Sequence, residues 1–149
     1  MINRRTAREL ALHMIFELGF SDGSATNMLH DYFTDKQAAL WADECEMYRE
    51  LPEGPQLDYV RRVVSGVDEH MAELDRYIET YAKNWKFGRI SRIAASIMRL
   101  SMYELMYCED IPNASSINEA VELAKKYDSD EAASFVNGVL GAYARKELL

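Results

Sequence analysis

Three arginines near the start of the chain are the residues whose type and spacing point most clearly to chemistry. They are Arg4, Arg5 and Arg8. On a helix, residues three or four positions apart lie on the same face, so these guanidinium groups would gather near the N-terminus of a helix. Cations are unfavourable at that end of the helix dipole. The cluster is therefore either a solvated face with a small cost or a site that meets an anion, and composition alone favours the solvated face.

A second basic stretch lies between Ala82 and Tyr103, which carries five basic residues and no acidic one. The net charge of −8 argues against a nucleic-acid partner when the chain is taken as a whole. However, salt screens charges beyond about 8 Å, so a polyanion responds to local charge. One hypothesis is a track that binds a polyanion, and the alternative is a solvated linker between two helical bundles. The basic residues of this track would be Lys83, Lys86, Arg89 and Arg92.

Catalytic and metal-binding patterns find no support in the sequence. The three histidines are scattered, and Cys45 and Cys108 do not have the spacing of metal ligands. There is no glycine-rich phosphate loop and no nucleophile elbow. No carboxylate stands in a context that predicts a shifted pKa. We therefore expect a protein that is not an enzyme and that needs no metal or cofactor.

The elements that position these residues are predicted to be helices. The chain has 149 residues, 48% of them hydrophobic, with seven glycines and three prolines, which favours one all-α domain with a sizeable core. Helices are expected over residues 4–18, 25–33, 56–81, 90–107, 116–127 and 130–145. The stretch 34–55 is acidic and is predicted to be an insertion or a long connection. The N-terminus lacks the apolar segment of a signal peptide, so a cytoplasmic location is expected.

Three of these predicted helices carry distinctive patterns. Residues 90–107 are apolar around most of the helix, which predicts a central helix surrounded by others, and three internal charges argue against a membrane span. Residues 56–81 have apolar side chains at steps of three and four, which predicts one long helix packed inside a bundle. Ser116, followed by Glu119, is interpreted as a capping box that begins a helix.

Four motifs in the second half of the chain occur in a fixed order. They are MRLSMYELMY at 98–107, DIP at 110–112, INEAVELAKKY at 117–127 and FVNGVL at 135–140. Together with RRTARELA at 4–11, they resemble the NusB family of bacterial transcription antitermination factors. The resemblance covers the first helix and everything from about Gln56 onward. Residues 20–55 have no recognisable match.

This resemblance implies a fold, a function and a site. The fold is all-α, with two packed three-helix bundles and about six to seven helices in a single RNA-binding domain over residues 1–149. The bundles would span about 1–81 and 82–149. NusB-like proteins bind single-stranded boxA RNA of ribosomal RNA leader transcripts together with NusE, a small-subunit ribosomal protein, in a complex with other Nus factors and RNA polymerase. The RNA-binding residues of the family fall here on Arg4, Arg5, Arg8, Tyr127, Glu131 and Ser134.

The sequence departs from the family pattern at three positions. Family members often have a basic residue at Ser134, a glycine at Asp128, and an acidic residue near Ala94 on the helix that faces NusE. The first two changes remove or oppose positive charge beside the expected RNA path. Two alternative functions stay open. One is a protein-binding scaffold or homodimer without RNA binding. The other is a stand-alone relative of the NusB-like domain of ribosomal RNA cytosine methyltransferases, which the lack of a methyl-donor domain disfavours.

Overall fold

All secondary-structure elements of the described chain are helices. The computed structural model describes residues 2–19, 24–32, 51–82 and 90–148, and these ranges contain no strand. The prediction of an all-α fold is therefore confirmed. The helices in chain order are α1 (Arg4–Leu18), α2 (Ala25–Tyr32), α4 (Gly54–Glu69), α5 (Met71–Tyr81), α6 (Arg92–Tyr107), α7 (Asn113–Tyr127) and α8 (Asp130–Glu147).

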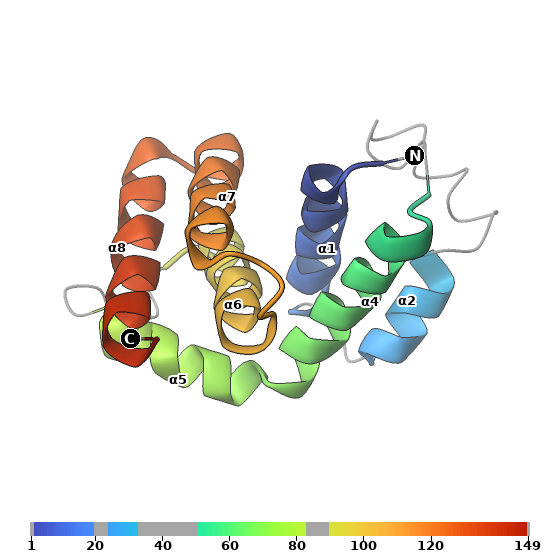
Figure 1. Cartoon of the computed structure of the whole chain (residues 1–149), viewed down its shortest axis with the longest axis horizontal. Coiled ribbons are helices and arrows are strands. Elements are labelled where there is room, and N and C mark those ends of the chain that lie inside the picture. Colours follow the sequence, from blue (N-terminus) through green and yellow to red (C-terminus); the bar gives the residue numbers. More distant parts are fainter. Residues whose placement is uncertain (1, 20–23, 33–50, 83–89, 149) are drawn as a thin grey trace. The chain divides into compact units, whose positions relative to one another are not determined.

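The chain divides into two compact units. The first unit is Met1–Asp68 and the second is Glu69–Leu149. The first contains α1, α2 and almost all of α4, and the second contains α5 to α8 (Figure 1). The division thus falls earlier than the boundary near residue 81 that the sequence suggests, because α5 groups with the helices that follow it. Residues 34–50 of the acidic stretch lie outside the described residues.

Apolar residues at helical spacing form the interior of the first unit. The side chain of Asn3 caps α1 by accepting a hydrogen bond from the backbone N–H of Thr6 at 2.8 Å. The helix then buries most of its apolar residues, and α4 buries a valine-rich side. The buried apolar residues of these two helices are Ala7, Leu10, Ala11, Leu12, Met14, Ile15, Leu18, Tyr59, Val60, Val63, Val64 and Val67.

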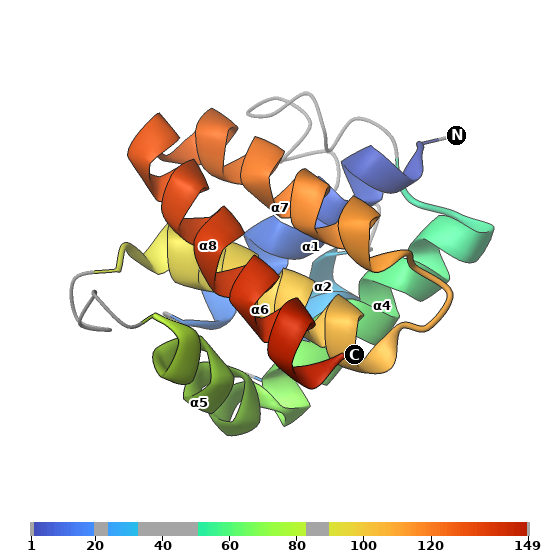
Figure 2. The same ribbon diagram turned by 60° about the vertical axis from the view of Figure 1, so that its left-hand side comes forward.

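Helix α6 is the central helix of the second unit, as its sequence predicts. It contacts α5, α7 and α8, and its residues Ile97, Met98 and Met102 are at most 1% exposed. Helices α7 and α8 lie side by side and run in opposite directions (Figure 1 and Figure 2). None of the described helices is long and apolar enough to cross a membrane. The fold therefore surrounds the apolar circumference of α6 with other helices.

Charged side chains also hold α5 within the second unit. Arg99 on α6 donates two hydrogen bonds to Asp75 on α5, from Nε at 2.7 Å and from Nη2 at 3.0 Å. At the C-terminal end of α5, the Tyr81 hydroxyl donates to Glu147 Oε1 on α8 at 2.6 Å. This hydrogen bond raises the pKa of Tyr81 to about 12. Both contacts tie α5 to later helices, in agreement with its place in the second unit.

The prediction of one continuous helix over residues 56–81 is wrong. Helix α4 ends at Glu69 and α5 begins at Met71, with His70 between them at φ −107° and ψ 17°. That ψ lies far from the helical value of about −42°. The His70 ring stacks on Tyr107 of α6, with ring centroids 4.5 Å apart. No proline or glycine stands at this break, so local helix propensity does not predict it.

The prediction that Ser116 begins a helix is also wrong. Helix α7 starts three residues earlier, at Asn113, immediately after Pro112. Ser116 lies inside the helix at 1% exposure, with its Oγ 2.9 Å from Oγ of Ser101 on α6. The serine therefore satisfies a buried polar contact between two helices rather than capping one.

Substitution by alanine is expected to change stability in opposite directions at two glycines with open surroundings, Gly54 and Gly138. A Cβ at Gly138, inside α8, or at Gly54, at the start of α4, would meet nothing within 4 Å. Gly54 has φ +52°, a backbone conformation that is unfavourable for L-residues. Gly138 does not have a positive φ. We expect Gly138→Ala to stabilise the protein by about 0.5–1 kcal/mol through helix propensity. Gly54→Ala should instead destabilise it by about 1–2 kcal/mol. Urea unfolding of both variants checks this, and equal signs would contradict it.

Candidate nucleic-acid interface

The three predicted arginines all lie in the first two turns of α1, but their environments differ. Arg5 is exposed, Arg4 is half-buried, and Arg8 is only 6% exposed. Successive residues on a helix are about 100° apart, so Arg5 projects from a different side of α1 than Arg4. The cluster is therefore not one uniformly solvated face. Arg5 is the member that presents most of its surface to solvent.

Helix α4 provides the surroundings of Arg4 and Arg8. The guanidinium carbon of Arg4 lies 4.3 Å from the ring centroid of Tyr59, and that of Arg8 lies 5.5 Å from the same centroid. Tyr59 is 3% exposed, so this cation–π contact is largely shielded from water. Arg4 Nε also donates a hydrogen bond to Gln56 Oε1 at 2.8 Å. Sequence reasoning missed both α4 residues.

A pattern in the sequence could have indicated Tyr59. It stands four residues before Val63 and next to Val60, both of which are 0% exposed. It therefore belongs to the buried side of α4, where an aromatic ring can meet a neighbouring helix. The predicted series of apolar residues at steps of three and four does not include Tyr59, because Leu57, Val60 and Val64 already complete the heptad spacing.

The other predicted RNA-binding residues lie in the second unit, around the turn between α7 and α8. Tyr127 is the last residue of α7 and is half-buried, with Lys126 Nζ 5.3 Å from its ring centroid. Ser129 caps α8 by accepting a hydrogen bond from the N–H of Ala132 at 3.0 Å. Glu131 and Ser134 are exposed on the first turns of α8. These side chains are thus available at the surface of the second unit.

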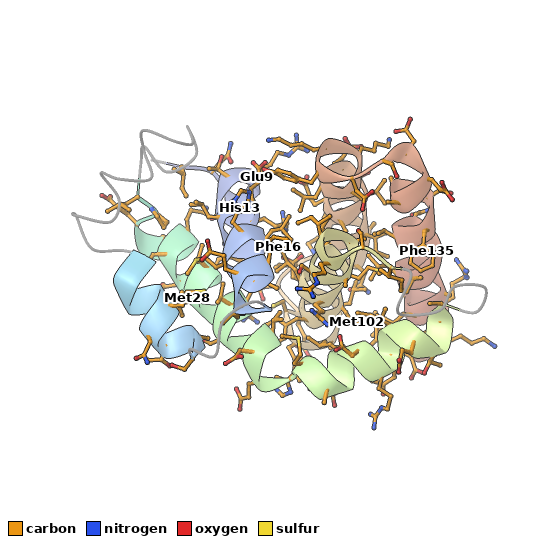
Figure 3. The ribbon with its side chains drawn as sticks, turned by 180° about the vertical axis from the view of Figure 1, so that it is seen from behind. Glu9, His13, Phe16, Met28, Met102 and Phe135 are labelled. Atoms are coloured by element: carbon orange, nitrogen blue, oxygen red, sulfur yellow. The ribbon has the colours of Figure 1, made fainter. Side chains whose placement is uncertain are left out.

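A cavity of about 180 Å³ opens beside this turn. It brings Glu131 together with Asp128 and Ala94, whereas Tyr127 and Ser134 are not part of its lining. Figure 3 labels Phe135, the aromatic residue of its wall. The cavity thus combines carboxylates with apolar surface. Its lining residues are Ile90, Ser91, Ala94, Asp128, Ser129, Glu131, Ala132 and Phe135.

Asp128 joins the turn to the start of α6. Ser91 Oγ donates a hydrogen bond to Asp128 Oδ2 at 2.5 Å and accepts one from the N–H of Ala94 at 3.1 Å. Ser91 is the cap of α6, so a single hydroxyl serves both contacts. The backbone of Asp128 has φ −133° and ψ −100°.

Comparison with known proteins identifies the family. The model of the NusB family matches residues 5–145. The chain belongs to the NusB family. It is 39% identical over 140 residues to the transcription antitermination protein NusB of Clostridium botulinum (strain Kyoto / Type A2), covering 94% of this chain and 98% of that one. This membership confirms the resemblance and, because the family consists of transcription antitermination factors, the prediction that the protein is not an enzyme.

Solved structures of NusB proteins have the same fold. The structure of T. maritima NusB has a TM-score of 0.70 and 26% identity, and the match covers 97% of this chain and 92% of that one. A crystal structure described as antitermination factors NusB and NusE in complex with double-stranded RNA has a TM-score of 0.71 and 22% identity, with 95% and 96% coverage. The NusB fold therefore extends over nearly the whole chain.

The basic stretch of this NusB-family chain is described only at its end. Arg92 is the exposed first residue of α6, next to Ser91 of the cavity lining. The other three members, Lys83, Lys86 and Arg89, lie outside the described residues. Among the described residues, no group of three or more histidine, cysteine, aspartate or glutamate side chains could hold a metal ion.

Proposed function

We propose that this NusB-family protein is a transcription antitermination factor that binds boxA-type single-stranded RNA of ribosomal RNA leader transcripts together with NusE. The observation that carries the proposal is the match over 94% of the chain to a transcription antitermination protein. A solved structure with the same fold is described as antitermination factors NusB and NusE in complex with double-stranded RNA. In this function the protein works in the cytoplasm as part of a complex with other Nus factors and RNA polymerase.

Two groups of side chains would contact the RNA. In the first unit, Arg5 is exposed and Arg4 is half-buried, and guanidinium groups suit phosphates and guanine edges. In the second unit, the half-buried ring of Tyr127 can stack on an unpaired base, a contact that contributes about 1–3 kcal/mol per base. Glu131 and Ser134 would complete the contacts at the start of α8. Arg8 is too buried to reach RNA by itself and supports the others.

The test of this function is a titration of the protein with a short boxA-type RNA, with and without NusE, over a range of salt concentrations. We expect NusE to tighten RNA binding, and log K to fall linearly with log salt because phosphate contacts release counterions. A scrambled RNA of the same length is the control. If NusE binds and RNA does not, the protein is a protein-binding scaffold. A dimer that binds RNA only after dissociation would support the homodimer alternative, and binding of neither partner would refute the function.

The basic stretch is proposed to extend the RNA track. Replacing Lys83, Lys86 and Arg89 together by alanine should lower the salt slope of RNA binding by about 2, because each phosphate contact on a single strand contributes about 0.7. The measurement is the same salt titration of the triple variant. An unchanged slope would show that this stretch is a solvated linker.

The carboxylate of Asp128 is expected to weaken RNA binding. Asp128→Asn keeps an acceptor for the Ser91 hydroxyl but removes one negative charge beside the α7–α8 turn. RNA affinity at low salt should rise about two- to five-fold, the usual size of an exposed charge interaction. The matched control is Glu109→Gln, an exposed carboxylate before α7. Glu109 precedes the N-terminus of α7 and Asp128 follows its C-terminus, and α7 is about 22 Å long. Equal effects of both variants would mean that only net charge matters.

A further inference from the structure

The guanidinium group of Arg4 is held from two directions by α4. Its carbon Cζ lies over the Tyr59 ring, 4.3 Å from the ring centroid, and its Nε donates to Gln56 Oε1 at 2.8 Å. We propose that Gln56 and Tyr59 are positioning residues, which fix the guanidinium of Arg4 in the orientation that grips a backbone phosphate of the RNA. This inference rests on the proposed function, and it adds two residues on α4 to the arginine motif of α1.

The two contacts leave one end of the guanidinium group available. Gln56 accepts the hydrogen bond of Nε, and the Tyr59 ring lies beside the guanidinium carbon. Among the residues that the structure describes, no protein group hydrogen-bonds to the two terminal nitrogens of Arg4. These Nη groups form the fork that matches two oxygens of a phosphate. Arg4 is also half-buried, so its contacts are partly shielded from water without closing off the fork.

Arg8 lies near the same ring. It lies one helical turn after Arg4, is 6% exposed, and places its guanidinium carbon 5.5 Å from the Tyr59 centroid. Tyr59 itself is 3% exposed. The ring is therefore fixed in place, and a fixed ring can restrict the side chain of Arg4. Within the arginine motif, Arg5 reaches out from α1, Arg4 is oriented by α4, and Arg8 packs against the ring.

If Arg4 is already oriented in the free protein, its side chain loses less conformational entropy when RNA binds. An arginine side chain is rich in rotamers, and immobilising it at an interface is unfavourable. Removing either support should therefore weaken RNA binding by about 3- to 10-fold while the charge of Arg4 stays the same. Because both supports act through Arg4, their effects should disappear when Arg4 is already replaced by alanine.

The experiment compares Gln56→Ala, Tyr59→Leu and Tyr59→Phe with the unchanged protein, each with and without Arg4→Ala. Two quantities are measured for the full chain: the ¹⁵N order parameter of Arg4 Nε without RNA, and RNA affinity as a function of salt. Far-UV circular dichroism and thermal melting confirm that each variant is folded. Gln56→Ala alters a half-buried side chain, so it tests the inference even if the buried position of Tyr59 does not tolerate leucine.

We expect Arg4 Nε to be ordered in the unchanged protein and in Tyr59→Phe, which keeps the ring. It should be mobile in Gln56→Ala and Tyr59→Leu, and these two should lose RNA affinity only when Arg4 is present. An Arg4 Nε that is mobile in the unchanged protein would overturn the inference. So would effects of the α4 variants that persist in full beside Arg4→Ala. If the unchanged protein binds no RNA, the proposed function itself fails.

Discussion

Replacing Arg5 by glutamate is expected to weaken binding of boxA-type RNA by about 10- to 100-fold at low salt and to reduce the salt slope by about 1 or more. Arg5 is the exposed arginine of the motif on α1. The substitution removes a phosphate contact and also places a negative charge beside a polyanion. Because the side chain is exposed, the free energy of unfolding should change by only about 0.5 kcal/mol. RNA titration over several salt concentrations and urea unfolding measure the two effects.

Arg61→Glu provides the matched control for this charge reversal. Arg61 is exposed, like Arg5, and lies on α4 of the same unit. It follows Tyr59 by two residues, which is about 200° around the helix, so it points away from the arginine motif. Both variants change the net charge equally. If Arg61→Glu weakens RNA binding as much as Arg5→Glu, the RNA responds to overall charge and Arg5 has no special part in the site.

The largest effect on stability is expected for Leu140→Ala in α8. Leu140 is 0% exposed in the second unit, where α8 contacts α5, α6 and α7. Truncating its side chain removes apolar contacts and leaves a cavity, which typically costs about 2–5 kcal/mol. That is a large part of the free energy of unfolding of an ordinary domain, about 5–15 kcal/mol. Urea unfolding followed by circular dichroism measures the loss.

Asn137→Ala is the control on the same helix. Asn137 is exposed, and alanine has the higher helix propensity, so stability should stay the same or rise by up to about 0.7 kcal/mol. A loss of less than about 1 kcal/mol for Leu140→Ala would contradict the packing described here. A similar loss for both variants would show that α8 is sensitive to any substitution, rather than to the buried side in particular.

The sequence predicts the central helix well because its signal depends on burial alone. Apolar residues around most of α6 require surrounding helices, and Met98 and Met102 are indeed 0% exposed. The break at His70 could not be predicted in the same way. The apolar steps of three and four continue on both sides of it, and His70 contacts Tyr107, which is 37 residues away in sequence. Local propensity contains no information about such a contact.

The same distinction applies to the candidate interface. The arginine motif is visible in the sequence because its three members are neighbours on one helix. Arg5 is exposed, whereas Arg8 is buried and lies near Tyr59, which is more than 50 residues later in the chain and belongs to another helix. Charge and spacing could therefore predict which residues form the cluster. They could not predict which of these residues face solvent.

The guanidinium groups of Arg4 and Arg8 both lie near the ring of Tyr59. Natural variation at positions 4, 8 and 59 should therefore not be independent. A relative that has lost the aromatic ring at position 59 would leave two cations close together without their shared partner. We expect such relatives to have also replaced one of the two arginines by a smaller or neutral residue. Lysine is a poor substitute at position 4, because it keeps the charge but lacks the planar guanidinium group and its several N–H donors. The three positions should therefore change together in the history of the family.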